Sequence, residues 1–573
     1  MIATEHTFKT WDGNELFYRS WLPEKQFSQA LILFHRGHEH SARWQETVES
    51  LALDDIAIFA WDARGHGRSP GERGSAENLA AVIKDVDEFV KHLSASYHIA
   101  LPDMIVLGHS VGAVSMLAWV HDYAPPIRAM VVATPALRVK LYIPFAILLL
   151  RIKERLTGPG YVKSYVKATM LTHDAEQAAA YQADMLIFRQ IAVNILLDLH
   201  DTSTRLMADA GAFTTPTLMI SAGADWVVSL DAQEKFFCDL SSPVKELEVF
   251  PNLYHAVFHE KGRQQVVARV RKFIVERFAQ APVTTSLLDA DKSGHTKAEF
   301  DRLSSPGGAA FAPMRLAMKS IGRLSKGVNI GWTSGFDSGV TLDHVYKNQA
   351  EGITPLGRMI DRSFLDNIGW RGIRKRRVHL EKILRDAIES VHQAGNPVRI
   401  LDIATGGGRY VLETMYKLRH IPMTAVLRDY QQVNLDAAQQ LAGELDLTNV
   451  SIVQGDAFNR NSISAITPRP TIVIVSGLYE LFPSNAPLHE SLAGIAEALE
   501  PGGLLIYTNQ PWHPEVEFIA RVLTNREGQP WIMRRRTQAE MDELVRVAGF
   551  GKLEMAIDPW GIFTVSIARR LDS

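Results

Sequence analysis

The sequence predicts two consecutive α/β domains, each built on a mostly parallel β-sheet. The chain has 573 residues, of which 46% are hydrophobic and 22% charged, so it is too long for one hydrophobic core and has the composition of an ordinary globular protein. Short apolar runs alternate with segments of helical periodicity in residues 1–280 and again from Ala394 onwards. Strands separated by helices pair in parallel, so this alternation predicts sheets covered by helices on both faces.

Net charge and cysteine content exclude several classes of protein. A formal net charge of −3 gives no bulk attraction to nucleic acid, so we expect no nucleic-acid partner. The single cysteine, Cys238, excludes an intrachain disulfide and a multi-cysteine metal site, and we predict no metal site. Residues 1–6 show no basic region followed by an apolar core. We therefore expect a cytoplasmic protein, and peripheral contact with the inner face of the membrane stays open.

The first domain, residues 1–280, is predicted to begin with a β-hairpin. Residues 7–22 alternate in polarity around Asp12 and Gly13, which is a strong hairpin signal. Later apolar runs, interpreted as the remaining strands, lie near residues 31, 57, 104, 129, 217 and 246. An amphipathic helix over residues 264–278 is expected to close the domain.

Residues 104–112 place one serine on a tight turn between a strand and a helix. An apolar run leads into the sequence G-H-S-V-G at residues 108–112, and a helical pattern follows. In such a nucleophile elbow the serine accepts strained backbone angles, and the glycines make room for the turn. Ser110 is therefore the candidate nucleophile, and the backbone N–H of Val111 is a candidate donor to an oxyanion.

A serine nucleophile needs an acid and a base, which follow an elbow serine in that chain order. Asp225 lies in a small-residue loop after the strand near residue 217 and is the candidate acid. His255 lies just past the strand near residue 246 and is the candidate base. The alternative base is His259; we prefer His255 because it lies nearer the end of the strand.

These features together resemble one group of enzymes. Residues 35–41 (H-R-G-H-E-H-S), residues 62–69 (D-A-R-G-H-G-R-S), the elbow, Asp225 and His255 are similar to the monoacylglycerol lipase and lysophospholipase group of α/β-hydrolases, of the serine aminopeptidase S33 type. The resemblance implies an α/β-hydrolase fold and a serine esterase that acts on acylglycerols or lysophospholipids. It also implies that Gly37 supplies the second N–H of an oxyanion hole.

The chain departs from this group in the loop that carries Gly37. Members usually show His-Gly where this chain has His35 and Arg36, and His38 stands where another glycine is usual. We expect these bulkier side chains to affect the path of the loop, and with it the entrance for an acyl group.

Residues 135–211 interrupt the strand rhythm and read as helical with no strand. By the same resemblance this segment is a helical cap over Ser110. Its most apolar stretch, residues 142–150, is far shorter than the roughly 20 residues that span a bilayer. It is either a buried cap helix or part of an acyl tunnel that touches a membrane surface. The tunnel interpretation expects as lining residues Phe145, Ile147 and Leu148.

Residues 281–334 are rich in small residues and in proline, and we interpret them as a linker. Residues 289–294 imitate the first half of an EF-hand calcium loop. The twelfth position is Phe300, however, and the required glutamate would have to be there, so we expect no calcium site.

A glycine-rich turn follows the first strand of the second domain, residues 335–573. The strand from Val398 ends at Asp402 and runs into glycines at residues 406–408 before a helix begins. Such glycines let a nucleotide or amino-acid group approach the N–H groups of the helix N-terminus. The next two strands are also followed by carboxylates, Asp429 and Asp456.

The three acidic strand ends, with a fourth strand over residues 471–479 and E-P-G-G at residues 500–503 before a fifth, resemble class I S-adenosylmethionine-dependent methyltransferases. The resemblance implies a Rossmann-like fold preceded by a helical region, and S-adenosylmethionine as cofactor. It also implies a role for each of six residues: Gly406 and Gly408 wrap the methionine part, Asp429 holds the ribose, Asp456 and Ala457 read the adenine, and Asp402 anchors the loop.

Residues beyond the fourth and fifth strands are candidates for binding the methyl acceptor, because ligands of α/β sheets sit past the strand ends. They are Tyr479, Glu480 and residues 509–513, for which capping or loop packing is an equal alternative. The basic run at residues 371–377 is read as a solvated helix start, with contact to lipid phosphates as the sharper alternative.

The whole chain therefore resembles a fusion of a serine ester hydrolase and a methyltransferase, with an acyl ester or lipid as substrate. A different class of function stays open: a non-catalytic lipid-binding or scaffold protein that has kept both folds, or a chain in which only one domain is active.

Overall fold

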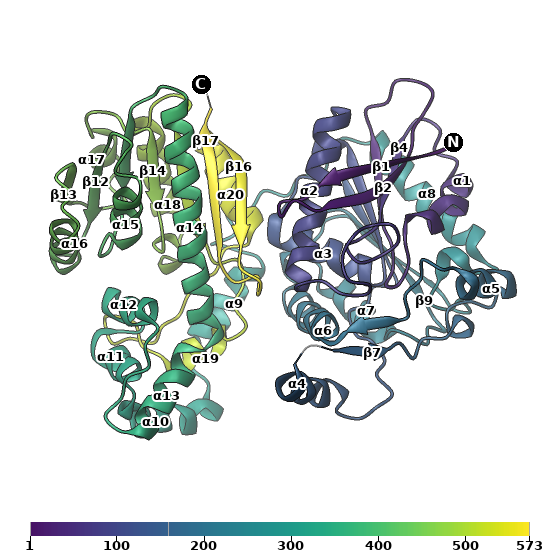
Figure 1. Ribbon diagram of the computed structural model, residues 1–573, viewed down its shortest axis with the longest axis horizontal. Helices are drawn as coiled ribbons and strands as arrows, with labels where there is room; N and C mark the ends of the chain where they lie inside the picture. Colours follow the sequence, from purple (N-terminus) through teal and green to yellow (C-terminus); the bar gives the residue numbers. More distant parts are fainter. Residues whose placement is uncertain (1, 159, 572–573) are drawn as a thin grey trace. The chain divides into compact units, whose positions relative to one another are not determined.

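The computed structural model describes residues 2–158 and 160–571, which form two compact units, Met1–Thr285 and Ser286–Ser573 (Figure 1). Each unit has its own β-sheet and its own buried apolar clusters. No helix in these described ranges is both long and apolar enough to cross a membrane.

An eight-stranded sheet forms the centre of the first unit, in the order β1-β2-β4-β3-β5-β6-β9-β10. The antiparallel strands β1 (Ala3–Lys9) and β2 (Glu15–Trp21) make the predicted hairpin. The other strands occupy all six predicted positions and pair in parallel with one another: β3 (Ala30–Phe34), β4 (Ala57–Trp61), β5 (Met104–His109), β6 (Ala129–Ala133), β9 (Thr217–Ala222) and β10 (Lys245–Phe250). Their carboxyl ends therefore meet at one edge of the sheet.

Helices cover both faces of this sheet. On one face α1 (Gln45–Leu51) and α8 (Arg263–Ala279) bury Leu51, Val270 and Phe273 against the strands. Two further helices, α2 (Leu79–Tyr97) and α3 (Val111–Tyr123), pack against each other, and α3 contacts β5. Because α3 starts directly after β5, residue 110 is held at the junction between strand and helix.

In its described residues the cap contains three α-helices and a small β-pair. The helices are α4 (Ala146–Thr157), α5 (Ala175–Ala183) and α6 (Val193–Ala208), and β7 (Tyr161–Lys163) pairs antiparallel with β8 (Gln190–Ala192). The expectation of a cap without strands was therefore wrong, because strands of three residues are too short to show alternation in the sequence.

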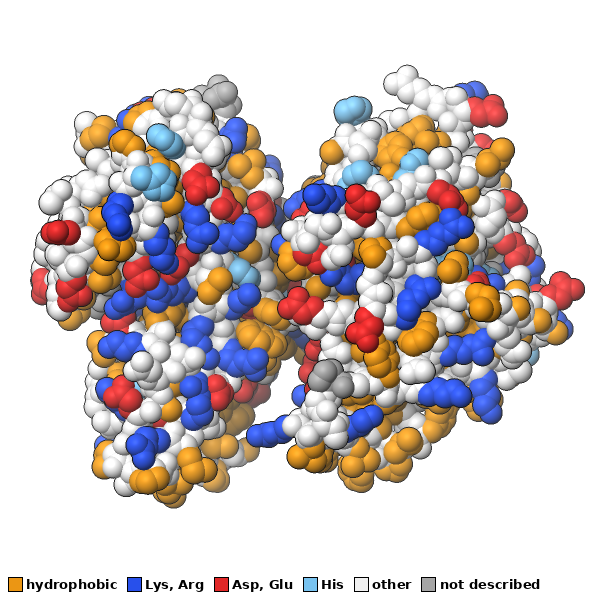
Figure 2. Space-filling model, in the orientation of Figure 1, with side chains coloured by type: hydrophobic (Ala, Val, Ile, Leu, Met, Phe, Trp, Pro, Cys, Tyr) orange, Lys and Arg blue, Asp and Glu red, His pale blue; other side chains and the backbone are white. Residues whose placement is uncertain are grey.

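Helix α4 has no buried residue, so its interpretation as a buried cap helix was also wrong. Phe145 and Leu156 are each 78% exposed, and Leu148 is 56% exposed. Figure 2 shows hydrophobic side chains gathered over α4 at the lower edge of this unit. The most apolar stretch of the sequence thus lies on the surface of the cap.

A seven-stranded sheet forms the centre of the second unit, in the order β13-β12-β11-β14-β15-β17-β16. The five parallel strands are those predicted: β11 (Val398–Asp402), β12 (Met423–Asp429), β13 (Val450–Gln454), β14 (Ile472–Val475) and β15 (Leu504–Asn509). An antiparallel pair that we did not predict completes it, β16 (Phe550–Ile557) and β17 (Thr564–Arg570). The sheet lies between two buried apolar clusters.

Helices pack on both faces of this second sheet. They are α14 (Ile368–Gln393), α15 (Arg409–Lys417), α16 (Gln432–Glu444), α17 (Arg460–Ser464), α18 (Ala486–Ala498) and α20 (Gln538–Val547). The helix α15 begins directly after the glycine turn, so the loop from β11 to α15 lies at the carboxyl edge of the sheet.

The predicted linker, residues 281–334, is mostly part of the second unit instead. It holds α9 (His295–Ser304), α10 (Ala312–Lys319) and α11 (Lys326–Ser334), which α12 (Gly339–Lys347) and α13 (Pro355–Leu365) follow. Arg534 donates to Thr296 Oγ1 at 2.8 Å, and Arg521 donates to the Ser305 carbonyl at 2.7 Å. These partners lie more than 200 residues apart, so local composition could not reveal them.

The calcium-like loop at residues 289–294 has structural partners in this unit. Asp291, from the calcium-like loop, accepts hydrogen bonds from the Asn485 N–H at 2.7 Å and Ser484 Oγ at 3.2 Å. Among the described residues no group of three or more His, Cys, Asp or Glu side chains could hold a metal ion.

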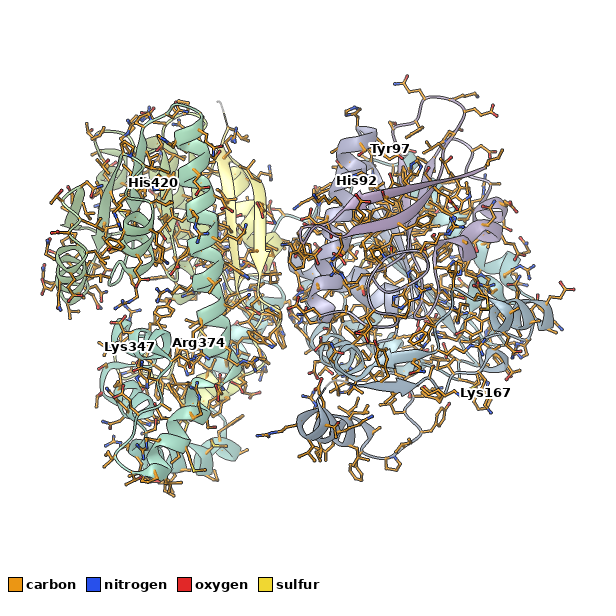
Figure 3. All side chains as sticks on the ribbon, viewed as in Figure 1. His92, Tyr97, Lys167, Lys347, Arg374 and His420 are labelled. Atoms are coloured by element: carbon orange, nitrogen blue, oxygen red, sulfur yellow. The ribbon has the colours of Figure 1, made fainter. Side chains whose placement is uncertain are left out.

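The basic run at residues 371–377 lies in the first turns of α14, as expected of a helix start, but only part of it is solvated. Arg374, labelled in Figure 3, donates to the Leu365 carbonyl at 2.9 Å. The guanidinium of Arg376 lies 5.1 Å from the centre of the Phe563 ring and is buried. Only Arg371 and Lys375 of the basic side chains in this run are exposed.

Two candidate active sites

Ser110 occupies the turn between β5 and α3 with strained backbone angles, φ 57° and ψ −115°. A Cβ atom on Gly108 would lie 2.6 Å from the Ala113 Cα, and one on Gly112 would lie 2.3 Å from the His35 carbonyl oxygen. Neither distance is tolerable, so glycine is required on both sides of the serine. Steric crowding therefore explains both glycines of the elbow, as the sequence suggested.

The three residues expected to form the triad lie within hydrogen-bond distance of one another. Ser110 Oγ is 2.8 Å from His255 Nε2, and His255 Nδ1 is 2.8 Å from Asp225 Oδ2. All three side chains are buried. With the Nδ1 proton donated to Asp225, Nε2 is free to accept the serine proton.

Asp225 is held as an acceptor by its own loop. Its Oδ1 accepts from the N–H groups of Val227 at 2.6 Å and Val228 at 3.0 Å. Burial alone would raise the pKa of Asp225, but His255 and these hydrogen bonds outweigh it and lower the pKa below the usual value. The carboxylate thus stays ionised beside the imidazole.

Two side chains that the sequence analysis missed hold the backbone of His255. The His255 carbonyl accepts from His109 Nε2 at 3.1 Å and from Thr134 Oγ1 at 3.2 Å. His109 directly precedes Ser110 in the elbow, and Thr134 follows β6 (Ala129–Ala133). No local pattern marks either, because their partner lies more than 100 residues further along the chain.

His259, the alternative base, lies elsewhere. Its Nε2 is 3.0 Å from the Arg43 carbonyl, and the ring is buried. Burial lowers the pKa of His259 to about 4. The residue is a packed part of the loop and does not contact Ser110.

The loop that departs from the hydrolase pattern is held by its unusual side chains. Arg36 is buried, pairs with Glu39 at 2.8 Å and lies over the Tyr181 ring at 5.2 Å. His35 Nε2 accepts from the Ala63 N–H at 3.0 Å. His38 has φ 70°, the left-handed conformation that glycine usually occupies, so the loop keeps the path that a glycine there implies.

A cavity of about 400 Å³ opens over Ser110 and His255. Gly37 and Val111, the expected oxyanion donors, line it, and a Cβ on Gly37 would lie only 3.2 Å from Val111 Cγ2. The cap contributes an apolar wall that includes Ile143, Ala146, Leu149, Leu150 and Leu196. The expected lining residues Phe145, Ile147 and Leu148 are not part of it, because they lie on other faces of α4 and its start.

The glycine turn of the second unit has the open shape expected of a ligand cradle. Gly406 has φ 56° and Gly408 has φ 67°, conformations that disfavour other residues. A Cβ on Gly406 would meet no atom within 4 Å, so this side of the loop is open. The Gly406 N–H donates to Asp429 Oδ2 at 2.9 Å, which joins the turn to the end of β12.

Asp402 lies beneath this turn and accepts a hydrogen bond from the Tyr410 hydroxyl. The Ala404 N–H also approaches its Oδ1 at 3.4 Å. Complete burial raises the pKa of Asp402 to about 7. These contacts join Asp402 to the loop and to the first turn of α15.

The other two acidic strand ends differ from each other. Asp429 Oδ1 accepts from the Gln431 N–H at 2.9 Å and from Asn434 Nδ2 at 3.0 Å. Asp456 is exposed and accepts from the Phe458 N–H at 2.9 Å. Ala457 is buried in the apolar cluster below. Asp429 is thus positioned by its own loop, whereas Asp456 faces solvent.

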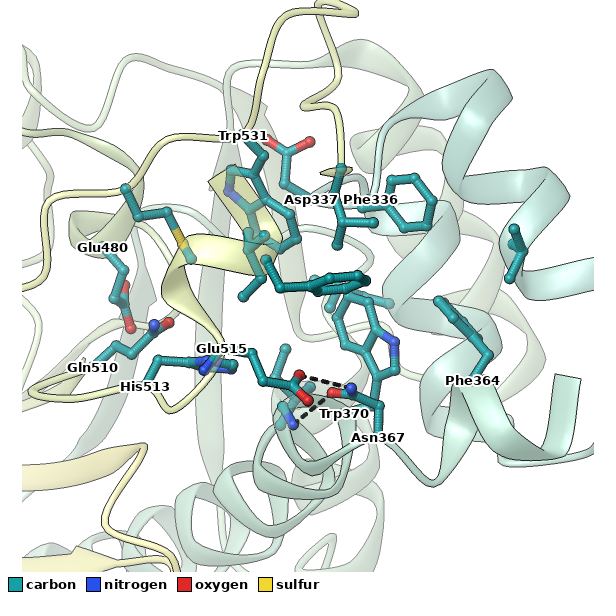
Figure 4. A pocket seen from close by; sticks show the side chains of 18 of the residues that line it. Phe336, Asp337, Phe364, Asn367, Trp370, Glu480, Gln510, His513, Glu515 and Trp531 are labelled. Carbon is teal, nitrogen blue, oxygen red and sulfur yellow. Dashed lines mark hydrogen bonds between the residues drawn. The ribbon is translucent and has the colours of Figure 1, made fainter. Parts of the chain in front are cut away.

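A second cavity, of about 350 Å³, lies beyond the ends of β14 and β15. Of the expected acceptor-binding residues it contains Glu480, Gln510 and His513 (Figure 4). Tyr479 instead donates to Ser491 Oγ in the core, and Asn509 donates to the Arg536 carbonyl. The opposite walls were not predicted and include Phe336, Trp370, Phe518, Trp531 and Phe563.

Comparison with known proteins gives a family to each unit. The model of a family described as "Putative methyltransferase" matches residues 270–570, and that of a family described as "Serine aminopeptidase, S33" matches residues 25–262. A protein of Escherichia coli strain K12, "Uncharacterized protein YnbC", is 46% identical over 584 residues, covering 100% of this chain and 99% of the relative.

Other relatives cover about half of this chain. A monoacylglycerol lipase of Mycolicibacterium smegmatis is 28% identical over 274 residues, 48% of this chain and 97% of the relative. The human monoglyceride lipase is 24% identical over 275 residues, 47% of this chain and 90% of the relative. A solved structure of a soluble variant of monoglyceride lipase from Saccharomyces cerevisiae aligns with a TM-score of 0.44 and 17% identity, covering 50% of this chain and 97% of that one.

Proposed function

We propose that this chain is a bifunctional enzyme. It belongs to the methyltransferase family whose model matches residues 270–570. The chain also carries an α/β-hydrolase domain of the S33 type. In this proposal the first unit is a serine hydrolase of acylglycerol or lysophospholipid esters. The second unit is an S-adenosylmethionine-dependent methyltransferase. Both would serve lipid metabolism on the cytoplasmic side of the cell.

The hydrolase proposal is supported most by the unbroken hydrogen-bond path from Ser110 through His255 to Asp225. In this mechanism His255 Nε2 accepts the Ser110 proton as Oγ attacks the ester carbonyl, and Asp225 stabilises the imidazolium. The alcohol leaves with that proton, and water then hydrolyses the acyl-enzyme by the same route. The N–H groups of Val111 and Gly37 would stabilise the oxyanion.

A test of this proposal is labelling with a fluorophosphonate, which reacts with activated serine nucleophiles. We expect one adduct, on Ser110, and none in the Ser110→Ala variant. Ser115→Ala is the matched control, because Ser115 also lines the cavity but donates to the Val111 carbonyl at 3.3 Å. Wild-type protein that stays unlabelled would contradict the proposal and favour a non-catalytic lipid-binding protein.

The exposed apolar side chains of the cap support contact with a lipid surface, where such esters reside. Phe145 and Leu156, at the start and near the end of α4, are each 78% exposed. Sedimentation with phosphatidylcholine vesicles should fall when both are replaced by serine. Equal sedimentation of the double variant and the wild type would show that these two side chains do not contribute to vesicle binding.

The residues of the second unit fit S-adenosylmethionine. The open face of Gly406 leaves room for close approach, and Asp429 keeps a carboxylate at the end of the next strand. Gly406 and Gly408 would hold the methionine part, Asp429 the ribose, and Asp456 with Ala457 the adenine, while Asp402 anchors the loop. The cofactor supplies an electrophilic methyl group, and the protein contributes alignment and exclusion of water.

Calorimetric titration of S-adenosylhomocysteine into the intact protein tests this assignment. We expect saturable binding with a Kd between micromolar and millimolar, unchanged by Ser110→Ala. If no heat of binding appears up to millimolar ligand, the second unit does not use this cofactor.

A further inference from the structure

The second cavity contains four buried polar atoms that have no hydrogen-bond partner among the described residues. They are Glu480 Oε2, Gln510 Nε2, Asp337 Oδ1 and Trp531 Nε1. Buried polar groups are almost always paired, so each exception needs an explanation. The four residues line one cavity, and a molecule bound at its Glu480 and Gln510 end would supply partners for two of these atoms.

Glu480 and Gln510 form the polar end of this cavity. Glu480 is 7% exposed and Gln510 5% exposed. Thr508 Oγ1 donates to Glu480 Oε1 at 2.8 Å, and Arg376 Nη1 lies 3.5 Å from the same oxygen, so Oε2 is left for a ligand. Gln510 follows directly after the end of β15 and lines the same cavity as Glu480. Figure 4 shows Glu480 and Gln510 at one side of the pocket.

His513 adds a neutral group to this end. Burial lowers the pKa of His513 to about 3, so the imidazole is uncharged at neutral pH. Its Nδ1 accepts from the Glu515 N–H at 3.0 Å, which leaves the proton on Nε2. The polar end thus presents one carboxylate oxygen as acceptor and two neutral N–H donors.

Aromatic rings form the rest of the wall. Trp370 and Trp531 lie with ring centres 6.5 Å apart and planes at 26°, and Phe336, Phe518 and Phe563 complete the lining. Trp370 and Phe336 come from α14 and the loop after α11, while Trp531 follows α19 (Val516–Val522). A flat aromatic molecule gains offset and edge contacts from such walls, and a flexible acyl chain does not.

We propose that this cavity binds the methyl acceptor and that the acceptor is a flat aromatic compound with a hydroxyl group, which donates to Glu480 Oε2 and accepts from Gln510 Nε2. The inference rests on the proposed methyltransferase function and replaces its lipid acceptor with an aromatic one. An ammonium group fits less well, because it has no lone pair for Gln510. A monoacylglycerol would leave the aromatic walls without a matching partner.

The carboxylate of Glu480 then has a chemical role as well as a binding role. The hydroxyl oxygen forms a bond to the methyl carbon of the sulfonium donor, the S–CH₃ bond breaks with its electron pair returning to sulfur, and the hydroxyl proton passes to Glu480 Oε2. The products are an aryl methyl ether, a neutral thioether and a protonated carboxyl group.

The test uses the intact protein and two probes, 2-naphthol and 2-methoxynaphthalene, which share a ring system but differ in the donated proton. Binding is followed by quenching of tryptophan fluorescence, since Trp370 and Trp531 line the cavity. We expect saturable quenching by 2-naphthol and at least tenfold weaker binding of the methyl ether, because the ether leaves Glu480 Oε2 unpaired. Equal binding of both probes would overturn the proposal.

Variants separate the polar end from the fold. Glu480→Gln and Gln510→Leu should each weaken 2-naphthol binding by roughly tenfold, since each removes one partner of the hydroxyl. Glu527→Gln, on an exposed loop, is the matched control and should have no effect. Unchanged affinity in both cavity variants, with circular dichroism like the wild type, would contradict the assignment.

Two further measurements distinguish this inference from the proposed function. S-adenosylhomocysteine binding should be the same in Glu480→Gln and wild type, whereas methylation of 2-naphthol should fall at least 100-fold in that variant. Binding of S-adenosylhomocysteine without binding of 2-naphthol overturns the acceptor assignment alone. Quenching by 1-monooleoylglycerol in place of 2-naphthol would also overturn it, in favour of a lipid acceptor.

Discussion

The two candidate active sites differ in how much of their hydrogen bonding the protein itself completes. In the hydrolase unit Ser110, His255 and Asp225 contact one another at 2.8 Å, and His109 and Thr134 hold the histidine backbone. In the second unit the large cavity keeps four buried polar atoms unpaired within the described residues.

This difference follows from the chemistry that each site would perform. A serine nucleophile must be activated by side chains, so its partners have to be in place before substrate arrives. Methyl transfer takes place between two bound molecules, so the protein has to leave groups open for them. The first site can therefore be recognised from hydrogen bonds that its side chains already make to one another. The second can be recognised from buried polar atoms that have no partner within the described residues.

The largest expected effect is the loss of esterase activity when the hydrogen bonds between Ser110, His255 and Asp225 are removed. Ser110→Ala and His255→Ala should each lower kcat/KM for a p-nitrophenyl ester by about 10³-fold or more, and the double variant should lose little further, because the members act as a unit. His259→Gln is the matched control and should keep most of the activity. The reverse pattern for the two histidines would identify His259 as the base.

A pH-dependent stability is expected of the second unit because of Asp402. Its pKa is about 7 in the fold against an ordinary value of 3.8, so the fold favours the protonated carboxyl group. The contribution of Asp402 to the free energy of unfolding is therefore complete below pH 3.8 and is lost as pH rises to about 7, at about 1.4 kcal/mol for each pKa unit.

Asp402→Asn should remove this dependence, so the variant gains stability relative to wild type as pH rises from 4.5 to 8. Thermal unfolding of the intact proteins across that range measures it. Asp436→Asn, at an exposed position of α16, controls for the loss of one charge. A constant difference between Asp402→Asn and wild type across the range would show that Asp402 is ionised throughout.

A smaller effect is expected at the cofactor loop. Asp429→Ala should weaken S-adenosylhomocysteine binding by about tenfold or more, through loss of both the proposed ribose contact and the hydrogen bond to Gly406. Calorimetry of the intact protein measures the change, and Asp436→Ala is the control on the following helix. Binding equal to wild type would remove Asp429 from the cofactor site.

A graded effect is expected of the cavity over Ser110 if it binds the acyl chain. Each methylene that enters it should contribute about 0.8 kcal/mol, so kcat/KM should rise from acetyl to octanoyl esters. Leu196→Trp should fill the cavity and abolish that rise, while Phe145→Ser, outside the cavity, should preserve it. A chain-length preference that survives Leu196→Trp would place the acyl chain elsewhere.

The parts that could be predicted from the sequence are those set by neighbouring residues. The elbow at Ser110 and the turn at Gly406 each follow a strand and precede a helix, so a few consecutive residues specify the geometry. The positions of the parallel strands were likewise visible as short apolar runs, because a strand buried on both faces is apolar throughout.

The parts that were missed depend on contacts between distant residues. The helices in residues 281–334 have partners such as Arg521 and Arg534, which lie beyond residue 500. The aromatic walls of the second cavity come from segments between Phe336 and Phe563, and no local pattern links them. Only its polar end, at Glu480 and Gln510, could be predicted, because it lies directly past two strand ends.

One measurement tests the account of two independent active sites most directly. The intact protein is treated with a fluorophosphonate, the modified residue is identified by mass spectrometry, and S-adenosylhomocysteine is then titrated into the labelled protein by calorimetry. We predict complete modification of Ser110 and an S-adenosylhomocysteine Kd equal to that of unlabelled protein. Absence of an adduct at Ser110, or absence of S-adenosylhomocysteine binding, would contradict the account.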